Sequence, residues 1–183
     1  MSRARVLADF VGGTTTISGN PTFTGSTVGA GKILQVVKNE ITSTSSWTGW
    51  NDVITQAITP SATSSKILIQ FSGMFGFDYR YAALRLYRDS TQIAKGDAEG
   101  SRTPVFIASF ATHEISNQLY ISENLSGVHL DSPSTTSAIT YKINAGHIHA
   151  TNRTSYNNRP VYDGNQIYFS RGTTSLILTE VAG

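Results

Sequence analysis

The stretch Ser175-Leu176-Ile177-Leu178-Thr179-Glu180-Val181-Ala182 decides the fold class of this chain of 183 residues. Apolar and β-branched residues favour a strand, and residues two apart along a strand point to the same face. One of the two alternating sets therefore faces a core. The sets are Leu176, Leu178 and Glu180 on one side and Ile177, Thr179 and Val181 on the other. We expect the chain to finish inside a sheet, with no tail beyond it.

Similar short apolar runs recur along the chain from residue 32 onward. Strands are predicted at 33–37, 52–58, 66–71, 83–88, 91–95, 105–108, 119–121, 139–143, 166–169 and 176–181. Turn-forming residues separate these runs, for example Pro60-Ser61, Asp89-Ser90 and Asp163-Gly164-Asn165. Many short strands at regular spacing predict an all-β protein, a β-sandwich or barrel, with no helix longer than a turn or two.

The N-terminal part of the chain has a different composition. Residues 14–28 are rich in Thr and Gly, and their only large apolar side chains are Ile17, Phe23 and Val28. Such a segment cannot bury a core of its own. We expect an extended arm over residues 1–30, either intertwined as in a fibre shaft or a flexible linker, and a knob domain over residues 31–183.

Residues 2–10 have the pattern of a short amphipathic turn, too short to be a stable helix alone in water. Docked on a surface, this turn would anchor the arm; the alternative is a frayed terminus. The anchor candidates are Arg3, Arg5, Leu7 and Phe10. The apolar run here is also too short for a signal-peptide core or a membrane span.

Composition excludes several classes of protein. The formal net charge is only +2, which argues against nucleic-acid binding by phosphate neutralisation. The chain has no cysteine, so disulfides and thiolate metal sites are excluded. A disulfide-free extracellular protein of this size needs another source of stability, and burial between subunits is the expected one.

Several motifs of the knob resemble virion proteins of tailed phages, especially marine and cyanobacterial ones. They are Gly31-Lys32-Ile33-Leu34-Gln35-Val36-Val37, the run Ile58 to Ile69, Leu86-Tyr87-Arg88-Asp89-Ser90-Thr91-Gln92-Ile93, Tyr141-Lys142-Ile143, Asn152-Arg153 and the ending Ser175 to Gly183. The opening Met1-Ser2-Arg3-Ala4-Arg5 is similar too. The resemblance implies a jelly-roll-like β-sandwich, similar to the trimers of complement-type and tumour-necrosis-factor-like proteins.

Catalytic motifs are not recognisable in the sequence. It has no nucleophile elbow, no phosphate-binding glycine loop and no metalloprotease motif. Asp97 and Glu99 are the carboxylate pair that glycan hydrolysis would use, but they lie in a polar, turn-rich segment typical of a solvated loop.

His147-Ile148-His149 is the sharpest metal-like pattern. Two histidines at i and i+2 of a strand point to one face, so three chains around a threefold axis would offer six imidazoles to a divalent metal. The alternative is a pair of exposed strand histidines without a metal.

Aromatic residues gather near Trp47 and Trp50, in residues 75–81 and in residues 156–162. Aromatic faces with polar neighbours bind sugars, and the same composition suits a protein interface or a core. Because Pro and Asn argue against a buried strand, the last segment is the better exposed candidate. Its receptor-binding candidates are Tyr156, Asn157, Asn158, Arg159 and Tyr162.

These features together predict a non-enzymatic phage virion protein without a resident cofactor. We expect a homotrimer attached to other virion proteins through its arm, with the knob on the outer surface or tail contacting a host glycan or protein. A short tail fibre or tail-tip adhesin is the first hypothesis. A capsid decoration or head-fibre protein is the alternative, and a glycan depolymerase is a third.

Overall fold

The computed structural model describes residues 31–109, 120–149 and 152–183, which form strands and connecting loops without an α-helix. The strands are β1 (Ile33–Ile41), β2 (Ser45–Thr48), β3 (Asn51–Ile58), β4 (Lys66–Phe77), β5 (Ala82–Arg88), β6 (Thr91–Ile93), β7 (Ile107–Ser109), β8 (Glu123–Asp131), β9 (Ile139–His147), β10 (Thr154–Asn157) and β11 (Thr174–Val181). The all-β prediction is confirmed.

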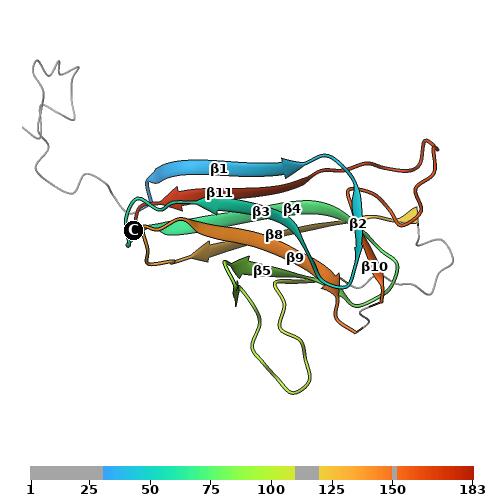
Figure 1. Cartoon of the computed structure of the whole chain (residues 1–183), viewed down its shortest axis with the longest axis horizontal. Coiled ribbons are helices and arrows are strands. Elements are labelled where there is room, and N and C mark those ends of the chain that lie inside the picture. Colours follow the sequence, from blue (N-terminus) through green and yellow to red (C-terminus); the bar gives the residue numbers. More distant parts are fainter. Residues whose placement is uncertain (1–30, 110–119, 150–151) are drawn as a thin grey trace, which may run out of the picture.

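The strands form two antiparallel sheets that pack face to face (Figure 1). The first, sheet A, has the order β1-β11-β4-β8, and β10 and β2 extend it beside the end of β4. The second, sheet B, has the order β3-β9-β5, with β6 and β7 both on the free edge of β5. Successive long strands alternate between the sheets, which is the connectivity of a jelly-roll sandwich.

The strand β11 lies at the centre of sheet A, between β1 and β4. Leu176, Leu178 and Glu180 are fully buried, so this is the set that faces the core. The prediction from the alternating C-terminal stretch is confirmed. The strand is also held at both edges, because β1 and β4 pair with β11 over its whole length and leave neither edge open to water.

The core lies between the sheets and is made mostly of Ile, Leu and Phe. Its buried members are Ile54, Ile58, Ile67, Ile69, Phe71, Phe75, Phe77, Ala82, Leu84, Leu86, Ile139, Tyr141, Ile143, Ala145, Leu176 and Leu178. These residues come from β3, β4, β5, β9 and β11, mostly at alternate positions, as the period of two requires.

One polar cluster is buried with this core. The hydroxyl of Tyr141 donates to Asp131 (2.7 Å), which also accepts from Arg88 (2.8 Å). Burial, and then the hydrogen bond to Asp131, raise the pKa of the Tyr141 phenol. The cluster ties β5, β8 and β9 together at one end of the sandwich.

The long strands run along the long axis of the molecule, so the sandwich has two distinct ends (Figure 1). Gly31 donates its backbone N–H to the carbonyl of Ala182, and Lys66 pairs with Val181. This end, called the proximal end, holds the C-terminus and the point where the chain enters from residue 30. At the opposite, distal end, β4 finishes at Phe77 and pairs with β10.

Three sequence expectations about strands need correction. Residues 166–169 are not a strand: Gln166 and Phe169 donate to Gly164 and Gln166 in consecutive turns. Of the strand expected over 119–121, Tyr120 and Ile121 lie outside every strand, and residue 119 lies outside the described residues. Conversely, β2, β8 and β10 had no predicted strand. The usual signal is missing because β8 exposes two of its three large apolar side chains, Val128 and Leu130, and β10 is built from Thr, Ser, Tyr and Asn.

Candidate functional site

The outer face of sheet A is apolar at its proximal half. Registered neighbours form cross-strand rows over β1, β11, β4 and β8. From the proximal end, the rows read Ile33-Val181-Lys66, then Val36-Thr179-Leu68-Leu130, then Lys38-Ile177-Gln70-Val128, then Glu40-Ser175-Ser72-Ser126. Val36 is 56%, Val128 63% and Leu130 49% exposed. Most side chains of the three proximal rows are apolar, interspersed with Lys38, Lys66 and Gln70, and an exposed apolar patch with a polar rim is typical of an interaction surface.

Sheet B has the opposite character on its outer face. Lys142 donates to Asp52 (2.7 Å) and lies over the ring of Tyr87, while Asn144 also donates to Asp52 (2.7 Å). Burial raises the pKa of Asp52, but the contacts with Lys142 and Asn144 outweigh it and lower the pKa. The guanidinium of Arg85 stacks on Trp50 at 3.6 Å. This face is therefore a solvated, charged surface, unlike that of sheet A.

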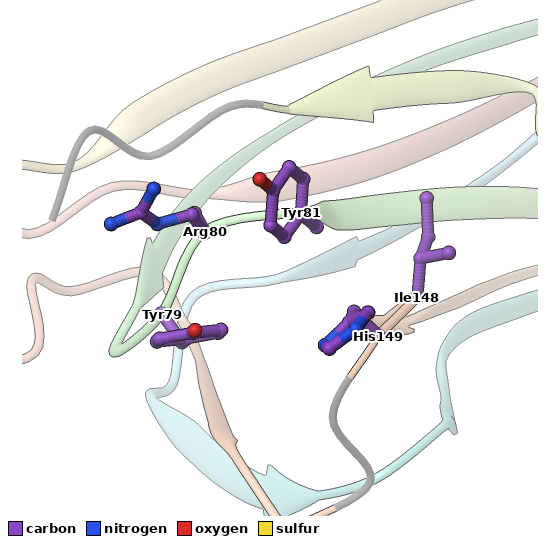
Figure 2. Close-up of a pocket in the computed structure, with 5 residues that line it drawn as sticks. All are labelled: Tyr79, Arg80, Tyr81, Ile148 and His149. Carbon is purple, nitrogen blue, oxygen red and sulfur yellow. The ribbon is translucent and has the colours of Figure 1, made fainter.

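A pocket of about 500 Å³ lies at the distal end (Figure 2). Its lining comes from two connections: Tyr79, Arg80 and Tyr81 link β4 to β5, and Ile148 and His149 follow β9. The two segments are tied by a hydrogen bond from the Ile148 N–H to the Tyr81 carbonyl (2.8 Å). In Figure 2, the rings of Tyr79 and His149 lie on one side of the space and that of Tyr81 on the other.

Cations surround the aromatic rings of this pocket. The guanidinium of Arg80 lies 6.0 Å from the ring centroids of both Tyr79 and Tyr81. Arg153 lies 4.2 Å from the Tyr79 ring. The nearest acid along the chain, Asp78, is engaged: it accepts from the Thr154 N–H at 2.9 Å. Guanidinium groups and aromatic rings therefore lie together at this pocket.

Tyr81 has a left-handed backbone, with φ of 63°, and its side chain is 40% exposed. A bulky residue in this region is uncommon and costs roughly 1–3 kcal/mol, and such strain clusters at binding sites. The fold thus holds a strained, exposed tyrosine at the mouth of the distal pocket.

A second aromatic surface, the loop cluster, also lies at the distal end. It consists of Tyr120, Tyr162, Tyr168 and Phe169, with ring centroids 4.8–5.7 Å apart between neighbours. Ion pairs from Arg171 to Asp163 (2.7 Å) hold the loop that carries most of it. Three of its four rings are exposed tyrosines, so the cluster is available for contact.

The five receptor-binding candidates do not form one exposed surface, and the expectation of an exposed segment over 156–162 is wrong in part. Asn157 and Asn158 are fully buried. Asn158 donates to the carbonyls of Ile41 and Ser43, and Thr174 donates to both asparagines. They hold β10 and the start of β11 in place.

The other three candidates differ in exposure. Tyr156 is half-buried in β10, and Arg159 stacks on its ring at 4.3 Å while donating to the Val161 carbonyl. Only Tyr162 is largely exposed, where it belongs to the loop cluster. Proline and asparagine signalled a loop, but the asparagine side chains satisfy buried backbone groups instead.

The two histidines of the metal pattern point to different environments. His147, the last residue of β9, is 1% exposed and packs edge-on against Phe77. Its Nε2 lies 3.4 Å from the Thr154 carbonyl and 3.6 Å from Asp78, and its Nδ1 lies 3.5 Å from the Arg80 carbonyl. His149 is exposed and lines the distal pocket. Since β9 ends at His147, the strand rule does not extend to His149, and the expected exposed pair is not formed.

No group of three or more His, Cys, Asp or Glu residues suited to a metal occurs among the residues that the structure describes. A metal on a threefold axis, held by His147 and His149, stays a prediction that would require His147 to leave its present contacts.

Asp97 and Glu99 lie on an exposed connection between β6 and β7 that extends away from the sandwich (Figure 1). Glu99 pairs with Arg102 at 3.9 Å on the same connection. The solvated-loop interpretation fits this position. The anchor candidates Arg3, Arg5, Leu7 and Phe10, and the whole expected arm, lie outside the described residues.

Comparison with known proteins gives no family for this chain: no family model and no curated protein matches it. Within the described ranges, no helix is long and apolar enough to cross a membrane.

Sequence patterns alone did not predict two features of the site. The apolar outer face of sheet A was not predicted. The pattern that could have predicted it is a set of apolar residues at outward-facing positions of β1, β11 and β8, namely Val36, Ile177, Val128 and Leu130. The sequence marked the aromatic run 75–81 as a candidate. It did not predict that Phe75 and Phe77 lie in the core while Tyr79 and Tyr81 line the pocket.

Proposed function

We propose that this chain is a structural protein of a tailed-phage virion. Its knob assembles as a homotrimer and meets the host surface as part of a short tail fibre or tail-tip adhesin. The observation that carries the assembly is the contrast between the outer faces of the two sheets. The virion setting rests on the sequence motifs that resemble tailed-phage proteins.

The apolar outer face of sheet A fits a second copy of the same chain. Four strands about 4.8 Å apart, with roughly eight residues of about 3.3 Å each, give the whole outer face of sheet A an area on the order of 500 Å², of which the apolar proximal half is roughly half. Each partner of a standard interface buries about 800 Å², so the apolar half would form the centre of an interface whose polar rim lies on the neighbouring surface. The charged outer face of sheet B suits the solvent-facing side of the same assembly.

The position of the apolar half supports a bundle of parallel chains. It lies at the proximal end, where residues 1–30 enter the knob through Gly31. Copies that associate here bring their N-terminal segments together and leave their distal ends, with the pocket and the loop cluster, pointing outward. This is the layout that an appendage attached by one end and recognising a surface by the other needs.

The interface is tested by charge insertion. Val128→Asp/Leu130→Asp places two carboxylates per chain on the proposed interface, where like charges face each other without water. We expect the full-length protein to be a trimer by light scattering and the double variant to be a monomer with an unchanged β-type circular dichroism spectrum. The matched control is Thr55→Asp/Ala57→Asp on the outer face of sheet B, which should stay trimeric.

Three outcomes would overturn the assembly: a monomeric wild type at micromolar concentration, a dimer, or dissociation of the sheet B control. A monomer could also result if residues 1–30 of the same chain cover the apolar face of sheet A. In that case deletion of residues 1–30 would make the knob aggregate, and this result identifies it.

The virion setting is tested on particles. Antibody labelling of intact phage should place the subunit at the tail, with the knob outward. Labelling on the capsid would replace the tail hypothesis with the decoration hypothesis, and absence from purified particles would contradict both. Sugar release from host envelope by the purified protein would favour the depolymerase instead.

A further inference from the structure

The connection from β10 to β11 contains a braced loop over residues 158–172, which reaches beyond the end of β11 (Figure 1). Its two ends meet, because the Gly172 N–H donates to the Asn158 carbonyl at 3.2 Å. Inside it, Arg171 pairs with Asp163, and the ring of Phe169 packs against Gly164, where an added Cβ would lie only 2.8 Å from the ring. A compact loop with closed ends and its own internal packing is an Ω-loop, a type that is frequently functional.

The apex of this Ω-loop breaks the usual chemistry of a turn. The Phe169 N–H donates to the Gln166 carbonyl at 3.1 Å, which places Ile167 and Tyr168 at the two corner positions. Corner positions are usually taken by Gly, Pro, Asn, Asp or Ser, and a β-branched or large aromatic residue gains nothing for the turn. Ile167 is fully exposed and Tyr168 is 65% exposed, so packing within the knob gives little in return. Positions that break a local rule in this way are expected to be functional.

The side chains become less exposed and more polar away from this apex. Tyr162 and Tyr120 are 56% and 43% exposed, and their ring centroids lie 5.3 Å apart. The Asp163–Arg171 ion pair joins the positions four residues before and four residues after Ile167. The order is therefore an apolar apex, then tyrosine rings with polar ends, then a paired charge at the base of the loop.

This order matches a lipid surface better than a glycan. The side chain of Ile167 has no hydrogen-bonding group, so it gains most from a partner that offers a hydrocarbon environment. Tyrosine is enriched where the hydrocarbon of a bilayer meets its polar headgroups, because one end of the side chain is apolar and the other is polar.

The backbone of the loop also suits shallow insertion. Unbonded N–H groups are costly to move out of water into lipid. The N–H groups of Gln166 and Phe169 are bonded inside the loop, to the carbonyls of Gly164 and Gln166. The Asp163 carboxylate is paired with Arg171, so its charge is neutralised before the loop approaches lipid phosphates.

We propose that the apex of the Ω-loop, Ile167 and Tyr168, inserts into the interfacial region of a lipid bilayer, with Tyr162 and Tyr120 at the level of the headgroups. This goes beyond the proposed function. It depends neither on the trimer nor on the virion, since one chain supplies the whole apex. Three apices on the proposed trimer would strengthen the contact by acting together.

The first test is flotation of the purified full-length chain with phosphatidylcholine vesicles, which carry no net charge. We expect the protein to float with the vesicles. Ile167→Asp/Tyr168→Asp should weaken vesicle binding at least about tenfold, with an unchanged melting temperature because both side chains are exposed. The matched control is Thr55→Asp/Ala57→Asp, which adds the same charge on the outer face of sheet B and should float like the wild type.

The second test measures insertion directly. In Ile167→Trp, the emission of the new tryptophan should shift to shorter wavelength on vesicle binding, and brominated phosphatidylcholine should quench it. Ala57→Trp is the matched control, on the exposed outer face of sheet B. It should show no more quenching than Trp47 and Trp50 give in the wild type.

Four results would overturn the proposal. They are a wild type that does not float, equal flotation of the folded apex variant, an equal loss of binding in the sheet B control, and an Ile167→Trp signal that the brominated lipid leaves unchanged. The first result would favour a protein partner with an apolar pocket for the apex. A monomeric protein that binds vesicles through Ile167 and Tyr168 would overturn the trimer and leave the insertion intact.

Discussion

At the scale of single residues, Glu180 shows how a carboxylate is kept in the sandwich interior. It is fully buried, and it accepts hydrogen bonds from the Ser61 N–H (2.7 Å), the Ser61 hydroxyl (2.6 Å) and Gln35 (2.6 Å). Burial raises the pKa of Glu180, but these bonds and one from Ser65 outweigh it and lower the pKa to about 2. The charged form is therefore built into the fold.

The pH dependence of stability follows from this lowered pKa. Because the folded-state pKa is below the ordinary value of 4.5, Glu180 contributes stability above that pH and loses it as the pH falls toward about 2. Glu180→Gln should lower the free energy of unfolding at pH 7 by about 2 kcal/mol and flatten the loss between pH 4.5 and 2. Urea unfolding at several pH values measures both, with the exposed Glu40→Gln as the control. Parallel pH profiles for Glu180→Gln and wild type would contradict the assignment.

Gly76 illustrates a different constraint at the residue scale, a close backbone approach. A Cβ added here would lie 2.8 Å from both the Arg159 carbonyl oxygen and the Val161 nitrogen, which are backbone atoms that cannot move cheaply. Gly76→Ala should destabilise the knob by about 1–3 kcal/mol. Gly96→Ala is the matched control, since nothing lies within 4 Å of its Cβ position. Thermal unfolding checks the pair, and equal melting temperatures would show that the distal loop adapts freely.

At the scale of elements, β11 is the strand on which sheet A depends. It pairs with β1 on one edge and with β4 on the other, and it buries Leu176 and Leu178. Each leucine contributes roughly 1.5–3 kcal/mol of burial, against a typical total stability of about 5–15 kcal/mol. Loss of the strand also exposes two new edges that invite aggregation.

Deletion of residues 175–183 should therefore give an insoluble or unfolded protein. Deletion of Gly183 alone should leave the melting temperature unchanged, because the last backbone bonds of the sheet belong to Ala182. Solubility and circular dichroism distinguish the two. A soluble truncated protein with a cooperative melting transition would mean that β11 is peripheral.

At the scale of the whole molecule, the sandwich separates its tasks between its two ends. The proximal end receives the chain from residue 30 and carries the apolar half of sheet A, and the distal end carries the pocket and the loop cluster. This polarity is what the proposed appendage needs. The two ends are also separate in the described part of the chain, where none of the residues that line the pocket belongs to the apolar outer face of sheet A.

Deletion of residues 2–30 tests this separation. The knob should stay folded and keep its oligomeric state, because residues 14–28 have only three large apolar side chains and cannot bury a core of their own. Attachment to the particle should be lost, with Arg3, Arg5, Leu7 and Phe10 contributing most. Incorporation of the truncated chain into particles in a complementation assay is the measurement. Normal incorporation would remove the anchor role from the arm.

The sequence by itself determined the all-β class and the alternation by which one face of the last strand is buried, and the structure decided which face it is. Both follow from the period of two, which is a local property of neighbouring residues. Most strands were found for the same reason. Strand β8 was missed because Val128 and Leu130 face outward and only Leu125 packs against the core, so the strand has no apolar alternation on its inner face.

Only the tertiary structure decided the environments of the polar candidates. Asn158 is buried because Ile41 and Ser43, more than a hundred residues earlier, bring backbone carbonyls to it. His147 is buried beside Asp78, and the pocket exists because the chain after β9 meets the connection between β4 and β5. Whether a polar side chain is satisfied inside or offered to a ligand depends on such distant partners. A local pattern contains no information about them.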